Sequence, residues 1–411
     1  MADGSSGVTR RRLLGAGAGT VGGIALAGGG YAVGKEAEAD DPTAQGAQTV
    51  PFHGRHQAGI ATEAQDRLHF AAFDLTLDTA DELRELLMAW TRAAALMTAG
   101  RPAGAPNRAQ FVPPADTGEA FGLPPSRLTV TFGLGPTAFE RRGEDRFGLR
   151  DRMPSALRPL PLLPGDELDP DRSGGDLCVQ ACANDPQVAF HAVRNLTRLA
   201  RGAVIMRWSQ LGFGRTSTTT RSQSTPRNLM GLKDGTKNLR AEDTKALAKH
   251  VWVGSEGPAW MRDGTYLVAR RIRMLIETWD RASLKDQEDT IGRHKYSGAP
   301  LGSSDEFDPV DAERLPVDAH VRLSEQKTHG QFLLRRGYSF TDGMDARTGQ
   351  LDAGLFFICF QRDAHRQFVP IQRRLGLNDA LNEYIKHVGS GLFAVPPGAS
   401  RTGFVGERLF S

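Results

Sequence analysis

The chain of 411 residues has few cysteines and only a slight surplus of basic residues. Three cysteines cannot build a disulfide framework, and Cys178 and Cys182 have no further ligands at the spacing of a zinc site. We therefore favour a structural role for all three over a bridge or a metal pair. The 51 basic residues barely exceed the 48 acidic ones, whereas a protein that follows nucleic-acid phosphates carries a strong basic surplus on one domain. The composition thus indicates no nucleic-acid partner.

The N-terminus lacks an uninterrupted apolar run that could span a membrane. A twin arginine, Arg10 and Arg11, precedes an apolar stretch with many glycines, which lower both helix propensity and hydrophobicity. Small residues at Ala37 and Ala39 suit a signal peptidase. This layout predicts a cleavable twin-arginine export signal with its linker over residues 1–50, and a mature protein that is extracellular, periplasmic or at the cell surface. Because that route carries folded proteins, it also predicts a cofactor.

Hydrophobic patterning after the signal predicts strands and helices in a recognisable order. Thr79 is a helix cap candidate, and Pro186 suits the first turn of a second helix. The order β-α-β-β-α-β is that of a ferredoxin-like domain. The expected strands are 67–77, 127–135, 176–184 and 202–214, and the expected helices are 79–98 and 185–200.

A similar pattern follows in the second half. We therefore expect an α+β protein with two ferredoxin-like domains, 51–225 and 226–411, each with an antiparallel sheet and peripheral helices. A functional site is expected between or beside the sheets. The expected strands of this half are 264–274, 329–340, 353–363 and 390–398, and the expected helices are 275–292 and 366–388.

One connection in the second half is unusually long. About 38 residues separate the helix ending near Gly292 from the strand at Gln331. Connections of this length are uncommon in a compact domain unless they bind something. This one carries His294 and His320, of which either could be a metal ligand.

Three short motifs in the second half carry chemistry: GLKDG at 231–235, AHVRL at 319–323 and LLRRGY at 333–338. Taken singly, the aspartate and the histidine have ordinary explanations in turns and loops. Arg335 and Arg336, however, lie on an alternating strand, so one guanidinium should point inward and the other to solvent. A buried guanidinium needs an anionic partner, which is a first indication of a site.

Together these motifs resemble the dye-decolorizing peroxidases, a family of haem enzymes. The resemblance extends from about Pro51 to Gly398 and includes IGRHKYSGAPL at 291–301. It implies haem b (iron protoporphyrin IX) in the C-terminal domain, with His320 as the iron ligand in preference to His294. Neutral imidazole suits that role.

On the opposite, distal side of the haem, the resemblance implies that Asp234 moves a proton between the two peroxide oxygens and that Arg335 stabilises the developing negative charge. We favour Arg335 over Arg336 because it aligns with the family's single distal arginine. The expected behaviour is reduction of hydrogen peroxide with one-electron oxidation of organic (dye-like or phenolic) or metal donors.

Further residues are expected around the cofactor. Gly231 and Gly235 would let the backbone pass close to the porphyrin, with Lys233 between them. Arg322 could bond a haem propionate, with a surface ion pair as the alternative. Leu355 and Phe357 are expected either to form the floor of the distal pocket or to belong to the core. The second nitrogen of His320 should bond to a carboxylate, either Asp379 or Glu383.

Two other functions remain open from the sequence. The first is an exported haem- or iron-handling protein linked to iron uptake, which could have an extracellular redox or iron-uptake partner protein. The second is a non-enzymatic haem-binding or sensing module, which would not require Asp234 and Arg335. The reducing substrate is not identified, and the candidate electron relays are Trp208, Trp252, Trp260, Trp279, Tyr296 and Tyr338.

Overall fold

The computed structural model describes residues 48–107, 109–325 and 330–411. The predicted export signal therefore lies almost entirely outside the described residues. Within the described part of the chain, no helix combines the length and the apolar character needed to cross a bilayer.

Eight antiparallel strands form two sets of four with the ferredoxin-like order. In the first set the order is β2-β5-β1-β6, and in the second it is β11-β7-β10-β9, because β7 also pairs with β10. Short pairings of β11 with β2 and of β6 with β9 join the sets edge to edge, and the two-residue strand β8 (Leu334–Arg335) pairs with β10. The expected α+β class with two ferredoxin-like sheets is confirmed. The bounds are β1 (Arg67–Leu75), β2 (Thr129–Leu134), β5 (Leu177–Ala183), β6 (Val204–Arg215), β7 (Thr265–Met274), β9 (Tyr338–Met344), β10 (Leu351–Gln361) and β11 (Ile385–Val395).

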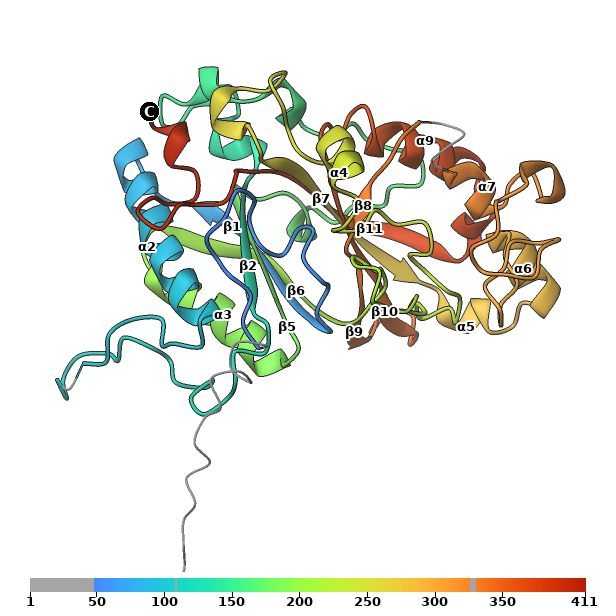
Figure 1. The fold of residues 1–411 in the computed structure, drawn as a ribbon, viewed down its shortest axis with the longest axis horizontal. Coiled ribbons are helices and arrows are strands. Elements are labelled where there is room, and N and C mark those ends of the chain that lie inside the picture. Colours follow the sequence, from blue (N-terminus) through green and yellow to red (C-terminus); the bar gives the residue numbers. More distant parts are fainter. Residues whose placement is uncertain (1–47, 108, 326–329) are drawn as a thin grey trace, which may run out of the picture. The chain divides into compact units, whose positions relative to one another are not determined.

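Helices α2 (Ala80–Thr98) and α3 (Pro186–Leu199) lie side by side against the first strand set (Figure 1). Thr79 caps α2 in a reciprocal capping box with Glu82, which confirms the predicted cap. The apolar face of α2 buries Trp90, whose indole nitrogen donates to the Leu196 carbonyl of α3 at 2.9 Å. These contacts make a large apolar core on this side of the first strand set.

Shorter helices surround the second strand set. They are α4 (Thr244–His250), α5 (Ile276–Trp279), α6 (Leu284–Ile291), α7 (His320–Ser324) and α9 (Phe368–Asn378). A two-stranded hairpin of β3 (Glu140–Arg141) and β4 (Glu144–Asp145) lies in the first half of the chain.

Two expected helices in this half were too long. The helix expected over 275–292 is divided into α5 and α6, because Ser283 caps a new start by accepting from the Asp286 amide. The helix expected over 366–388 ends at Asn378, and its last residues already belong to β11. The backbone pairing of Ile385 with Met274 of β7 outweighs the local helical pattern there.

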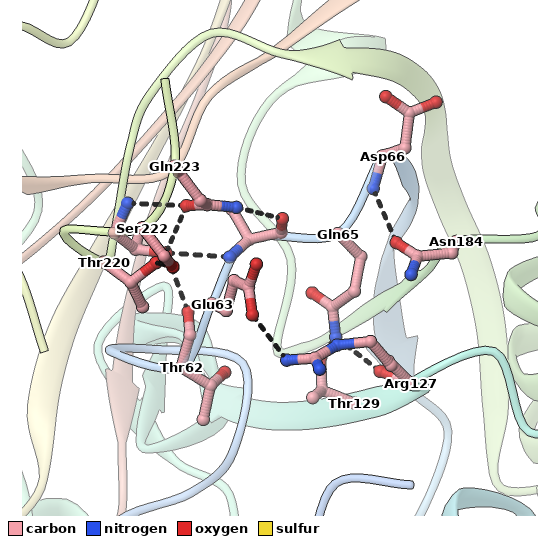
Figure 2. Close-up of polar contacts among 12 residues, drawn as sticks. Thr62, Glu63, Gln65, Asp66, Arg127, Thr129, Asn184, Thr220, Ser222 and Gln223 are labelled. Carbon is pink, nitrogen blue, oxygen red and sulfur yellow. Dashed lines mark hydrogen bonds and ion pairs between the residues drawn. The ribbon is translucent and has the colours of Figure 1, made fainter. Parts of the chain in front are cut away.

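The expectation that one guanidinium of the arginine pair faces solvent was wrong. Arg336 is 0% exposed, and it donates to the carbonyls of Thr62 and Glu63 and to the side chain of Gln65. Figure 2 shows that Glu63 in this segment also forms an ion pair with Arg127, with 2.9 Å between the charged atoms. Carbonyl oxygens thus replace the anionic partner that a buried guanidinium was expected to need.

The three cysteines are buried and unbridged. Cys178 and Cys182 pack in an apolar cluster on β5, and the Cys359 thiol on β10 donates to the Gln361 side chain. Burial raises the pKa of Cys178 and Cys359, which keeps both as neutral thiols. The structural role expected for the cysteines fits these positions.

Candidate active site

A cavity of about 220 Å³ in the second half of the chain brings together Asp234, His320 and Arg335. These residues lie in three separate segments: Asp234 in the loop before α4, His320 at the start of α7, and Arg335 on β8. The sequence motifs are about 86 and 15 residues apart, so only the fold makes them neighbours.

Asp234 and Arg335 form an ion pair inside this cavity. The guanidinium Nη1 donates to the carboxylate Oδ1 at 3.0 Å, and both side chains are partly exposed to the cavity. Asn238 holds the arginine backbone from both sides, donating to the Arg335 carbonyl and accepting from its amide at 2.8 Å each. The Asp234 amide donates to the Pro226 carbonyl at 2.9 Å. Backbone contacts therefore fix both partners of a paired base and cation.

His320 is held by a buried carboxylate behind its ring. Its Nδ1 lies 2.6 Å from Asp379 Oδ2, and the Asp379 side chain is only 2% exposed. Burial opposes protonation of the imidazole, but the charge and hydrogen bond of Asp379 outweigh it and raise the pKa of His320. Because Nδ1 is engaged, Nε2 is the nitrogen left to bind a metal. Of the two carboxylates expected here, Asp379 makes the contact, whereas Glu383 is exposed.

The lining of the cavity fits a haem. One imidazole nitrogen is available as an axial ligand, and the walls are mainly apolar, as a porphyrin requires. The Nε atom of Arg335 and the Nδ1 atom of His387 are buried without a partner among the described residues, so the lining also has polar capacity to spare. The apolar wall residues include Ile272, Val321, Leu355, Phe357, Phe368, Ile371 and Leu375.

The glycines of the GLKDG motif have reasons within the chain. Gly231 has φ +80° and Gly235 has φ +91°, both in the left-handed region. A Cβ on Gly235 would lie 2.8 Å from the Cα of Ser217, too close for any side chain. Between them, Lys233 forms an ion pair with Glu306. These contacts explain both glycines without reference to a bound group.

Several expected site residues lie elsewhere or have other partners. Gly231 and Arg322 are not part of the cavity lining, and Arg322 donates to the Leu315 carbonyl at 2.8 Å. His294, the rival ligand, lies outside the lining and contacts Glu288 at 3.0 Å. The propionate contact of Arg322 stays a prediction.

Among the polar lining residues that sequence reasoning missed are the buried Arg293 and His387. Arg293 is buried, donates to the carbonyls of Gly298 and Glu306, and has its pKa lowered by that burial. Arg293 lies in the IGRHK run, which the resemblance places beside the haem. That position could have marked it as a candidate site residue.

His387 is also buried. Its Nε2 lies 3.0 Å from the Gln372 amide nitrogen, and burial lowers its pKa to about 3. The sequence predicted a helix over this residue, and no local pattern indicated that its side chain lines the cavity.

Known proteins resemble this chain along most of its length. Two family models match it: Dyp-type peroxidase, N-terminal, over residues 57–214, and Dyp-type peroxidase, C-terminal, over residues 225–400. The chain is 37% identical over 412 residues to a deferrochelatase of Yersinia pestis, covering 95% of this chain and 92% of that protein. It is 37% identical over 362 residues to a deferrochelatase of Escherichia coli strain K12, covering 85% and 84%.

Solved structures agree with these matches. An X-ray generated oxyferrous complex of DtpA from Streptomyces lividans is similar with a TM-score of 0.80 and 43% identity, covering 89% of this chain and 99% of that one. A DyP-type peroxidase from Cellulomonas bogoriensis is similar with a TM-score of 0.78 and 38% identity, also covering 89% and 99%.

Proposed function

This chain belongs to the Dyp-type peroxidase family and is a haem-dependent peroxidase, and we propose that Asp234 and Arg335 activate hydrogen peroxide while His320 holds the haem iron. The observation that carries the proposal is the shared cavity. It holds the Asp234–Arg335 ion pair together with the His320–Asp379 pair, and the charges of Asp234 and Arg335 both act on His320.

Haem, when bound, supplies the redox chemistry that cleaves the peroxide bond and oxidises the donor. The Asp234 carboxylate accepts a proton from one peroxide oxygen and returns it to the other, so that water can leave. Arg335 holds that carboxylate at 3.0 Å and offsets the negative charge that develops on the departing oxygen. Asp379 orients the His320 ring and makes it a stronger ligand.

The test uses the haem-loaded protein and the variants Asp234→Asn and Arg335→Leu. We expect each variant to react with one equivalent of peroxide about 100-fold more slowly or worse, since general acid–base help and charge stabilisation each contribute about 100-fold. The haem absorption spectrum before peroxide should stay that of the parent. The measurement is the stopped-flow absorbance change of the Soret band.

A matched control is Asp243→Asn, which breaks a 3.1 Å ion pair with Arg221 outside the cavity and should leave the rate unchanged. His320→Ala should remove the axial-ligand signature from the spectrum. A peroxide rate for Asp234→Asn within about threefold of the parent would overturn the assigned role, because the general acid–base contribution is about 100-fold.

The similarity to proteins named deferrochelatase favours a second candidate, an exported haem- or iron-handling protein linked to iron uptake. The two functions differ in what leaves the protein. Release of iron, followed with a ferrous chelator, together with metal-free porphyrin fluorescence and without donor oxidation, would select the second candidate. Oxidation of an organic donor with retention of haem would select the first. An extracellular redox or iron-uptake protein is the proposed partner under the second.

Export through the twin-arginine route is also proposed, on the sequence of residues 1–50. Replacing Arg10 and Arg11 together by lysine should keep the protein in the cytoplasm, whereas Arg12→Lys should not. Cell fractionation and blotting give the readout. We further propose a domain boundary near residue 225, which the limits of the two family models support.

A further inference from the structure

A second cavity lies in the first half of the chain and shares no lining residue with the candidate active site. Its volume is about 660 Å³, within the usual range for small-molecule sites. Three segments form it: residues 49–53, α2 with its exit to Arg101, and residues 401–404.

The third segment lies against α2, because the amide of Val405 donates to the Thr91 hydroxyl at 3.1 Å. The amide of Gly54 likewise donates to the Ala399 carbonyl at 3.2 Å, which ties the first segment to the third. The cavity is therefore a built feature of the fold, which we call the arginine groove.

Positive charge converges on the arginine groove. Arg92 and Arg101 line it from α2 and its exit, Arg401 lines it from the third segment, and no aspartate or glutamate is among its lining residues. None of these three guanidiniums has an ion-pair or hydrogen-bond partner within residues 48–107, 109–325 and 330–411. His53 adds a ring nitrogen, Nδ1, that is shielded from solvent and unpartnered in the same part of the chain.

Most arginines around the active site have carbonyl or carboxylate partners, whereas these three have none among the described residues. Three like charges around one depression repel each other, and an anion bound among them would relieve that repulsion. Arginine suits this role because its planar guanidinium binds carboxylate, sulfonate and phosphate oxygens in pairs.

The floor of the arginine groove is apolar. Met88 is 37% exposed there, and Val50 and Leu96 are half-buried beside the buried rings of Phe52 and Phe404. An inorganic anion would leave this apolar area in water, whereas an organic anion would cover it. We propose that the arginine groove is a binding site for an amphipathic organic anion, with its acidic group among the arginines and its apolar body on the floor.

The test compares three probes on the haem-loaded protein, in which the first cavity is filled. 2-Naphthalenesulfonate has both the charge and the apolar body, 2-naphthalenesulfonamide has the body without the charge, and inorganic sulfate has the charge without the body. Isothermal titration calorimetry at low salt should show one site for the sulfonate, with the other two probes at least about tenfold weaker. Equal binding of the sulfonamide, equal binding of sulfate, or no sulfonate binding would each overturn the proposal.

Variants locate the site. Arg92→Gln and Arg401→Gln should each weaken sulfonate binding by about 2- to 5-fold, since exposed charge pairs are modest in strength. Arg84→Gln removes an exposed arginine from the same helix α2 outside the groove, and it should change nothing. A loss with Arg84→Gln as large as with Arg92→Gln would mean non-specific attraction and reject the site. An unchanged Soret spectrum in each variant shows that the fold is intact.

Discussion

Asp379→Asn should show whether Asp379 supports the function of His320 or merely lies near it. The hydrogen bond to be weakened is 2.6 Å long, joins a carboxylate to an imidazole nitrogen, and involves an Asp379 side chain that is only 2% exposed. Hydrogen bonds to charged groups contribute about 1.5–3 kcal/mol, and 1.4 kcal/mol corresponds to a factor of ten. We therefore expect haem affinity, peroxide rate or both to fall by about 10- to 100-fold, the usual range for partners behind a metal ligand.

Asparagine keeps an oxygen for the other contact of this residue, in which Asp379 Oδ1 accepts from the Leu381 amide at 2.9 Å. The local turn should therefore persist. The assay is titration of the apoprotein with haemin, followed by stopped-flow reaction of the loaded protein with peroxide.

Glu383→Gln is the matched control for Asp379→Asn, because that carboxylate is exposed and lies only four residues further along the chain. It should leave affinity and rate within twofold of the parent. If Asp379→Asn also stays within twofold on both measures, the His320–Asp379 pair has no functional weight and the reasoning fails.

Three further predictions concern stability, measured by chemical denaturation. Gly235→Ala places a Cβ 2.8 Å from the Ser217 Cα and should cost about 2–4 kcal/mol, whereas Gly143→Ala, also at positive φ but with open space around it, should cost only about 1–2 kcal/mol; equal costs would contradict the steric argument. Burial lowers the pKa of His69 to about 4, so between pH 6.5 and 4 the unfolded chain binds more protons. His69 alone therefore lowers the stability by about 2 kcal/mol from pH 7.5 to 5, in addition to the effect of buried His387, which has the same sign. His69→Gln should make that part of the profile less steep by its share of about 2 kcal/mol, while the slope from His387 remains, and an unchanged slope would show that His69 does not stay neutral in the folded protein. Arg336→Met leaves buried carbonyls without a donor and should cost about 2–4 kcal/mol with the haem spectrum unchanged; a shifted spectrum would place Arg336 in the haem site instead.

Local pattern was sufficient for most of the elements. Alternation predicts six of the eight long strands to within about two residues, and the capping pair of Thr79 and Glu82 marks the start of α2. The strand expected over 329–340 was wrong in its bounds, because the chain forms the short β8 and then β9, and β11 begins five residues before its expected start. The family resemblance, rather than local pattern, implied that Asp234, His320 and Arg335 share one site, and the structure brings them to one cavity. The strands and the helix start follow from residues close together in sequence, whose side-chain periodicity is set by backbone geometry alone.

Other features depend on partners that are distant in sequence. The choice of Asp379 over Glu383, the early end of α9, and the burial of Arg336 against Thr62 all arise from packing between segments about 60 to 270 residues apart. The arginine groove likewise exists only because residues 401–404 lie against α2. A local pattern can say that a charge lies on a strand or loop, but only tertiary packing decides whether carbonyls, a carboxylate or open space surrounds it. The energetic cost of desolvating a charge depends on those surroundings, and so does the chemistry that the charge can perform.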